Sequence, residues 1–326
     1  MLRYICKRIV YLIFVFFIMS ILLFIIYTAV PGDPARIRAE KYKTKDAVQY
    51  QMAYEQARED LGLDKPLPVR YFSWMSRMLQ GDFGYSTYYS RDVADLIVTP
   101  MKNTVILNIG AMVLALLITI PLGISCAVRR GGVYDNIIRI FTVIGYSIPQ
   151  FIIGLVFIYF FAVKLGWFPV SGFGTANFTG TFWEQVLDKA KYMALPLLVM
   201  TFSSLGGMTK YVRSAMIDSL NMDFVRTARA KGLREQVVVY VHAFRSALLP
   251  VITLIIGWFF GIFGGSLIIE NMFALNGMGK VYINCLQNQD YQVVLTLQMF
   301  YIIIGLIGNL IIDLSYGLAD PRVKLN

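Results

Sequence analysis

The sequence is poor in the side chains that build reactive centres. Its 326 residues include one histidine and three cysteines, and only 15% are charged. A histidine-based metal site and a histidine-based catalytic triad are therefore excluded. Cys6, Cys126 and Cys285 stand singly, without the spacing of metal or redox motifs, so we interpret them as packing residues. No catalytic residue and no metal site is predicted.

Charge is scarce because apolar residues dominate the composition. Hydrophobic residues make up 57% of the chain, whereas a soluble domain is about half apolar and about a quarter charged. The composition therefore predicts an all-α integral membrane protein. The net charge of +10 does not indicate a nucleic-acid partner, because Lys and Arg cluster between apolar runs, as the positive-inside rule expects.

Six apolar stretches are long enough to cross a bilayer, which takes about 20 residues per helix. We predict transmembrane helices at 9–30, 105–128, 137–163, 195–212, 251–269 and 293–314. The first is interpreted as an uncleaved span, because its apolar run is too long for a typical signal peptide. Pro121, Pro149 and Pro250 are placed where they can kink or begin helices.

The distribution of positive charge orients these spans. Seven Lys or Arg residues lie between Lys210 and Arg245, whereas the short connections 164–194 and 270–292 hold four between them. Both termini are therefore expected in the cytosol. The predicted organisation is a leader and first span at 1–30, an external segment at 31–100, a transmembrane domain at 101–316 and a cytosolic tail at 317–326. Within the external segment, 61–67 and 71–77 are expected to form short helices.

The predicted membrane interior offers small and weakly polar residues in place of charges. Acids and bases are absent from mid-depth, which disfavours an ion-coupled carrier. Five small residues either line a pathway or allow close helix packing: Ser203, Ser204, Gly257, Gly261 and Gly265. No Gly-x-x-x-x-Gly-Lys-Ser/Thr motif is present, so the chain cannot hydrolyse ATP itself. A subunit driven by a separate ATPase fits best; the alternatives are a stand-alone secondary carrier or passive channel, and a sensory or scaffold protein.

A short basic helix is predicted at 223–232, between two spans. Asp223 is a suitable N-cap, and Gly232 is a suitable residue for ending the helix. Val225, Ala228 and Gly232 fall at i, i+3 and i+7 and share one small face. We expect this face to lie in a groove on another protein. The alternative is an ordinary positively charged connection on the cytosolic side.

This stretch, 223–233, together with 242–250, resembles the coupling-helix motif of the permease subunits of bacterial type I ABC importers. The resemblance is to the first permease of the oligopeptide/dipeptide/nickel group. Shorter matches lie at 31–34, 61–66, 81–84, 168–172 and 320–322, so the resemblance covers nearly the whole chain. It implies the six-helix type I permease fold, with half of a translocation pathway formed by this chain.

The resemblance also implies partners and a location. The expected partners are a second permease, two ABC ATPase subunits that hold ATP and Mg, an external solute-binding protein, and the lipid of the bacterial inner membrane. No cofactor is expected in this chain. The residues expected to couple to the ATPase are Val225, Arg226, Thr227, Ala228, Arg229, Ala230, Lys231 and Gly232.

The sequence departs from the family pattern at three places. Arg226 replaces the Glu of the wider coupling motif. The stretches 274–279 and 289–292 replace the family's Ile-Pro-Gly-Leu-Gly and Arg-Asp-Tyr-Pro. The substrate is therefore left open between peptides, nickel chelates and oligosaccharides.

Overall fold

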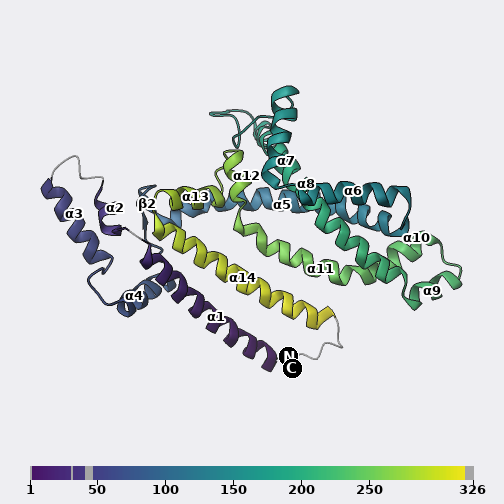
Figure 1. Cartoon of the computed structure of the whole chain (residues 1–326), viewed down its shortest axis with the longest axis horizontal. Coiled ribbons are helices and arrows are strands. Elements are labelled where there is room, and N and C mark those ends of the chain that lie inside the picture. Colours follow the sequence, from purple (N-terminus) through teal and green to yellow (C-terminus); the bar gives the residue numbers. More distant parts are fainter. Residues whose placement is uncertain (1, 31, 41–46, 320–326) are drawn as a thin grey trace. The chain divides into compact units, whose positions relative to one another are not determined.

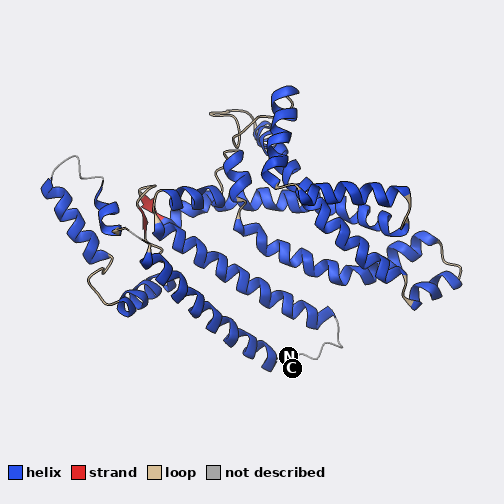
Figure 2. Cartoon of the chain, viewed as in Figure 1, coloured by secondary structure: helices blue, strands red, loops and turns tan. Residues whose placement is uncertain are grey.

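The chain is almost entirely helical (Figure 2), which confirms the predicted all-α class. The computed structural model describes residues 2–30, 32–40 and 47–319. Pro31 and the motif at 320–322 lie outside these residues. The contacts define two compact units, Met1–Met101 with Val281–Ile307 and Lys102–Lys280 with Gly308–Asn326.

Each unit has its own set of elements, and three helices have residues in both units. The first unit contains α1 (Leu2–Ala29), α2 (Pro34–Ala39), α3 (Ala47–Asp60), α4 (Leu67–Leu79) and the short antiparallel strands β1 (Tyr85–Ser86) and β2 (Arg91–Asp92). The shared helices are α5 (Val93–Val128), α13 (Met278–Gln287) and α14 (Tyr291–Ala319). The second unit contains α6 (Val133–Ser147), α7 (Gln150–Phe157), the π-helical η2 (Ile158–Lys164), α8 (Phe182–Leu220), α9 (Asp223–Ala230), α10 (Glu235–Val237), the π-helical η3 (Val238–Ala243), α11 (Phe244–Gly261), the 3₁₀ turn η4 (Ile262–Gly264) and α12 (Leu267–Met272).

Four described helices are long and apolar enough to cross a membrane. They are Tyr4–Ala29, Val93–Val128, Phe182–Leu220 and Tyr291–Ser315. Two bent pairs also qualify, Val133–Ser147 with Gln150–Lys164 and Glu235–Leu248 with Pro250–Gly264. Counting each bent pair as one span gives six, the number predicted from the sequence.

The third predicted span, 137–163, is not one straight helix. Its two halves, α6 and α7 with η2, meet at an angle of 103°. The break falls at Ile148, which is extended with ψ 127°, and Pro149, which precedes the first turn of α7. Proline disfavours helical geometry in the residue before it and cannot donate the hydrogen bond that would continue the helix. The prediction that Pro149 kinks or begins a helix is confirmed, and the predicted span is a bent pair of helices.

The fifth predicted span, 251–269, ends too late. Helix α11 stops at Gly261, one 3₁₀ turn follows, and Gly265 takes φ +67° before α12 begins. A Cβ atom at Gly265 would lie 2.8 Å from the backbone nitrogen of Gly279. Gly265 is therefore required for a turn and for the close approach of two backbone segments. It does not lie on the helix face that was expected from the sequence.

The core of the first unit joins α1, α4 and α14. It is built on Phe24, Trp74, Leu295 and Met299, and the Tyr71 hydroxyl lies 2.7 Å from Ser20 Oγ. The helix expected at 71–77 is thus confirmed within α4. The helix expected at 61–67 is wrong, because this stretch is a turn around Gly62 at φ +59°.

Helices α6 and α8 run antiparallel and pack tightly in the second unit (Figure 1). At one end the Asp135 carboxylate accepts two hydrogen bonds of 2.7 Å from the Arg213 guanidinium. Farther along α8, Gly206 lies against the Thr142 carbonyl group of α6. A Cβ atom at Gly206 would lie 2.7 Å from the Cβ atom of Tyr146. Only glycine allows the helices to approach this closely at Gly206.

We predict that Gly206→Ala lowers the free energy of unfolding by about 1–3 kcal/mol, because the added methyl group overlaps the Thr142 carbonyl group. Gly207 is the matched control, since a Cβ there meets no atom within 4 Å. Gly207→Ala should be neutral or stabilising by up to about 1 kcal/mol. Thermal midpoints of the purified chain in detergent test this pair. Equal losses from both variants would contradict the close approach.

Candidate functional site

Helix α9 is the basic helix predicted at 223–232, and its C-terminal end is confirmed. Gly232 adopts φ +75°. Its N–H donates to the Arg229 carbonyl oxygen at 2.9 Å, and the Leu233 N–H donates to the Ala228 carbonyl oxygen at 3.3 Å. These two hydrogen bonds form a Schellman motif, which ends a helix at a left-handed glycine.

The start of α9 differs from the prediction by one residue. Met222 is the N-cap, with extended geometry at φ −74° and ψ 150°, and Asp223 is already helical. The Asp223 side chain makes no capping hydrogen bond. Its carboxylate lies in the first turn, where the helix dipole favours negative charge. The assignment of Asp223 as the N-cap is therefore wrong.

The small face of α9 is turned into the protein's own core. Val225 and Ala228 are 0% and 5% exposed. They pack in one cluster with Met216 of α8 and with Val238 and Val239 of η3. The expectation that this face is free to meet another protein is wrong for Val225 and Ala228, because their side chains pack against α8 and η3. Gly232, the third residue of the predicted face, is exposed, and a Cβ there would meet no atom within 4 Å.

Other side chains of α9 and its flanking residues are exposed, and they include apolar and basic groups. Phe224 is 42% exposed, and Met222 and Leu233 at the two ends are 46% and 40% exposed. Arg226 and Lys231 are also exposed. Within the chain Arg229 is already held by Glu235, with 2.6 Å between the guanidinium and the carboxylate. The exposed side chains at α9 thus combine apolar groups with positive charges.

A second feature is a cavity of about 270 Å³ among α5, α7, α8 and α11. Asn108, Gln150 and Ser204 supply its polar side chains, and Gly257 and Gly261 form part of the wall. A Cβ at Gly261 would meet no atom within 4 Å, and one at Gly257 would only touch Ile312 at 4.0 Å. Neither glycine is needed for close packing in this chain.

The structure gathers three of the five small residues expected at a pathway and separates the other two. Ser204, Gly257 and Gly261 line the cavity. Ser203 does not line it, and its hydroxyl donates to the Val199 carbonyl oxygen of its own helix at 2.9 Å. Gly265 lies at the turn against Gly279 instead.

Sequence analysis missed the buried carboxylate of Glu270, which is 0% exposed. Its Oε1 accepts a hydrogen bond of 2.7 Å from the Thr104 hydroxyl. Its Oε2 accepts from the backbone N–H groups of Gly279 at 2.7 Å and Lys280 at 3.2 Å, and Ser266 N–H donates to Oε1 at 3.3 Å. The signal that could have revealed this site is an acid in an apolar run, followed by the glycines that let α13 approach it.

The Glu270 carboxylate organises the broken end of α11. Burial raises the pKa of Glu270, and the hydrogen bonds from Thr104 and the three backbone N–H groups oppose that rise. All four contacting groups are donors, an arrangement that satisfies an ionised carboxylate. The Thr104 hydroxyl also accepts from Met278 N–H at 2.8 Å. Thr104 thereby ties α5 to both α12 and α13.

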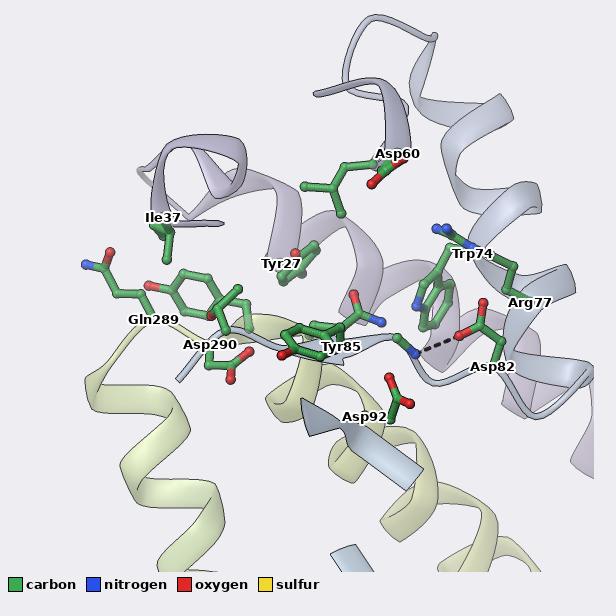
Figure 3. Close-up of a pocket in the computed structure, with 15 residues that line it drawn as sticks. Tyr27, Ile37, Asp60, Trp74, Arg77, Asp82, Tyr85, Asp92, Gln289 and Asp290 are labelled. Atoms are coloured by element: carbon green, nitrogen blue, oxygen red, sulfur yellow. Dashed lines mark hydrogen bonds between the residues drawn. The ribbon is translucent and has the colours of Figure 1, made fainter. Parts of the chain in front are cut away.

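The first unit has a pocket of about 310 Å³ beside the strands (Figure 3). Four carboxylates line it, against one cation, Arg77. Figure 3 shows two of them, Asp82 and Asp290, on opposite sides of Tyr85. A cationic group is the ligand charge that such a pocket attracts. Within the described residues, no group of three or more His, Cys, Asp or Glu side chains could hold a metal ion.

The departure at 289–292 contributes to the walls of this pocket. Asp290 accepts hydrogen bonds from the Ser86 hydroxyl and from Tyr88 N–H. Gln292 donates from Nε2 to the Phe83 carbonyl oxygen at 2.9 Å. The proline of the family pattern could not make this bond, so Gln292 ties α14 to the loop before β1.

Comparison with protein families gives the class of protein to which this chain belongs. Residues 119–325 match the family described as "Binding-protein-dependent transport system inner membrane component". Residues 1–108 match the N-terminal region described for the same transport systems. The chain belongs to this family. It is a permease subunit of a type I ABC importer, and not an enzyme, since ATP hydrolysis belongs to separate subunits.

Individual relatives match along their full length. The chain is 36% identical to the oligopeptide transport system permease protein AppB of Bacillus subtilis, covering 99% of this chain and 100% of AppB. It is 35% identical to a putative peptide permease of Brucella suis, with 100% of both chains covered. It is 33% identical to the glutathione transport system permease GsiC of Escherichia coli K12, with 99% of each covered. The protein is thus a multi-pass protein of the bacterial inner membrane that works with ATPase, binding-protein and permease partners.

We predict that Thr104→Val lowers the free energy of unfolding by about 1–3 kcal/mol, because Met278 N–H loses its acceptor and Glu270 loses a donor. Thr104→Ser is the control, since it keeps the hydroxyl. Thermal midpoints should fall for the valine variant only, and hydrogen exchange at the Met278 amide should accelerate. If serine and valine destabilise equally, the hydroxyl is not what holds this junction.

Proposed function

We propose that the chain forms half of a translocation pathway for peptides, paired with a second permease and driven by two ATPase subunits. An external binding protein delivers the peptide. The names of the relatives support this substrate class, since they specify oligopeptides, peptides and glutathione, itself a small peptide. Reconstitution in liposomes tests the proposal: peptide uptake should require ATP and the partner subunits, and uptake by this chain alone without ATP would contradict it.

The cavity among α5, α7, α8 and α11 is the proposed pathway lining. Its polar side chains, Asn108, Gln150 and Ser204, are uncharged donors and acceptors. Such groups can exchange hydrogen bonds with the amide backbone that all peptides share. A lining without charges also tolerates side chains of either sign, which suits a subunit whose selectivity rests with the binding protein.

We place both termini and α9 in the cytosol. The asymmetry of Lys and Arg among the short connections supports this orientation. A reporter fused after Arg234 should be cytosolic, and one fused near Tyr88 should be external. Alkaline phosphatase and green fluorescent protein fusions measure this directly. Both fusions reporting the same side would overturn the six-span topology.

We propose that α9 is the coupling helix and that its exposed face meets the ATPase. The observation that carries this proposal is the division of α9 into two faces. Val225 and Ala228 are fixed in the core, while Phe224 and Arg226 project from the same short helix. Exposed apolar side chains beside cations are typical of a surface that is covered in a complex.

We predict that Phe224→Asp with Arg226→Glu lowers solute-stimulated ATP hydrolysis and uptake about tenfold or more, the effect of losing a central contact. Both side chains are exposed, so expression and membrane insertion should persist. The measurement uses the assembled transporter with its binding protein in proteoliposomes.

Two control variants sharpen this test. Arg130→Glu changes an exposed cation in the connection between α5 and α6, and it should have little effect. Val225→Asp places a charge in the core, so it should reduce the yield of folded protein instead. If Arg130→Glu uncouples the transporter as strongly as the α9 variant, the helix is an ordinary positive connection.

A further inference from the structure

A second cavity of the second unit lies along α6 and α8, and it shares no lining residue with the proposed pathway. Its volume is about 550 Å³. The antiparallel register places the Asp135–Arg213 pair at one end and the Thr142–Gly206 approach seven residues farther along each helix. Seven helical residues span about 10 Å, so the cavity is an elongated groove along two membrane helices.

One end of this groove is positively charged. Arg139, Lys210 and Arg213 line it together with a single acid, Asp135. Asp135 is 1% exposed and is already paired with Arg213. Arg139 is exposed and donates only to the neutral Asn136 side chain, and Lys210 is exposed with no ion-pair partner among the described residues. Two positive charges are therefore left to face the groove.

The other end of the groove is apolar. Val143 and Tyr146 line it, with the narrow surface of Gly206 and Gly207 opposite. Tyr146 is 74% exposed. The groove thus changes from cationic to apolar along its length, beginning near the ends of both helices. A soluble anion would use only the first half of such a surface.

An independent observation is the Thr209 hydroxyl. Thr209 lines the groove and is 2% exposed, and its Oγ1 has no hydrogen-bond partner. A buried hydroxyl without a partner costs free energy, and a ligand in the groove that bonds to it would remove this cost. Thr209 lies between Gly206 and Lys210, at the junction of the apolar and charged ends.

We propose that this groove binds the headgroup of an anionic phospholipid, with the phosphate at Arg139 and Lys210 and the acyl region along Val143 and Tyr146. Basic pockets between transmembrane helices are typical sites for anionic headgroups, and each Lys or Arg contributes about 1 kcal/mol of attraction near an anionic surface. The Thr209 hydroxyl donates to a phosphate or ester oxygen of the lipid. The Asp135–Arg213 pair holds the two walls together and keeps Asp135 from repelling the phosphate.

The test uses the full transporter in nanodiscs of phosphatidylcholine with or without phosphatidylglycerol. Native mass spectrometry should show phosphatidylglycerol retained by the complex. Arg139→Ala with Lys210→Ala should weaken this retention about tenfold or more, because two attractive charges are lost. Arg129→Ala with Arg130→Ala removes two cations from the adjacent connection, outside the groove, and should change retention less than about twofold. Equal losses from both double variants, or none from either, would overturn the proposal.

Thr209→Val separates a ligand contact from a structural role. In phosphatidylcholine alone it should leave the thermal midpoint unchanged or raise it, because an unpartnered hydroxyl is removed. Phosphatidylglycerol should raise the thermal midpoint of the wild-type transporter above its value in phosphatidylcholine alone. Thr209→Val should make this increase smaller. If phosphatidylglycerol raises the thermal midpoint of the wild type and of Thr209→Val equally, the Thr209 hydroxyl does not contact the lipid.

Two further experiments distinguish a bound lipid from a soluble anion and from a protein interface. Inorganic phosphate added to phosphatidylcholine nanodiscs should not stabilise the transporter, and a gain equal to that from phosphatidylglycerol would show a soluble anion site instead. Co-purification of the second permease should be unchanged in the Arg139→Ala, Lys210→Ala variant. Loss of that subunit with lipid retention unchanged would identify the groove as a permease interface and overturn the lipid site.

Discussion

The structure depends on one constraint, which is that backbone groups in a hydrocarbon layer need partners within the protein. The breaks in the membrane helices show how this is met. Where α11 ends, the Asn108 side chain donates to the Ile262 carbonyl oxygen at 2.7 Å. The Glu270 carboxylate accepts from the free N–H groups at the start of α13. Helix α11 can therefore stop and α13 can begin within the protein, because side chains supply hydrogen-bond partners to the backbone groups at both breaks.

The same constraint explains why sequence reasoning placed most helices correctly. Long apolar runs must be helical in a membrane, so composition and length alone identified α1, α5, α8 and α14. The bend at Pro149 was signalled by the residue itself, whereas the end of α11 was not. Gly257, Gly261, Gly264 and Gly265 look alike in sequence, and only the approach of Gly279 shows that Gly265 is the turn.

The site could be predicted as a segment but not as a surface. The Schellman end at Gly232 follows from local backbone chemistry, so the sequence specified it. Which face of α9 is buried depends on residues of the neighbouring elements α8 and η3, such as Met216, Val238 and Val239. Small apolar residues at helical spacing suit a partner's groove and the protein's own core equally well. Glu270 and its donors were missed for the same reason, because Thr104 is distant in sequence.

The burial of α9 has a consequence for how a permease of this family can be driven. Val225 and Ala228 belong to one cluster with Ile124 of α5, Met208 and Val212 of α8, and Val251 of α11. Close-packed protein interiors have low compressibility and transmit strain. On the proposed coupling role of α9, a push on Phe224 or Arg226 is carried to three membrane helices together. Coupling by this route needs no flexible linker and no charged relay. It requires only that the small face stay packed while the outer face is bound.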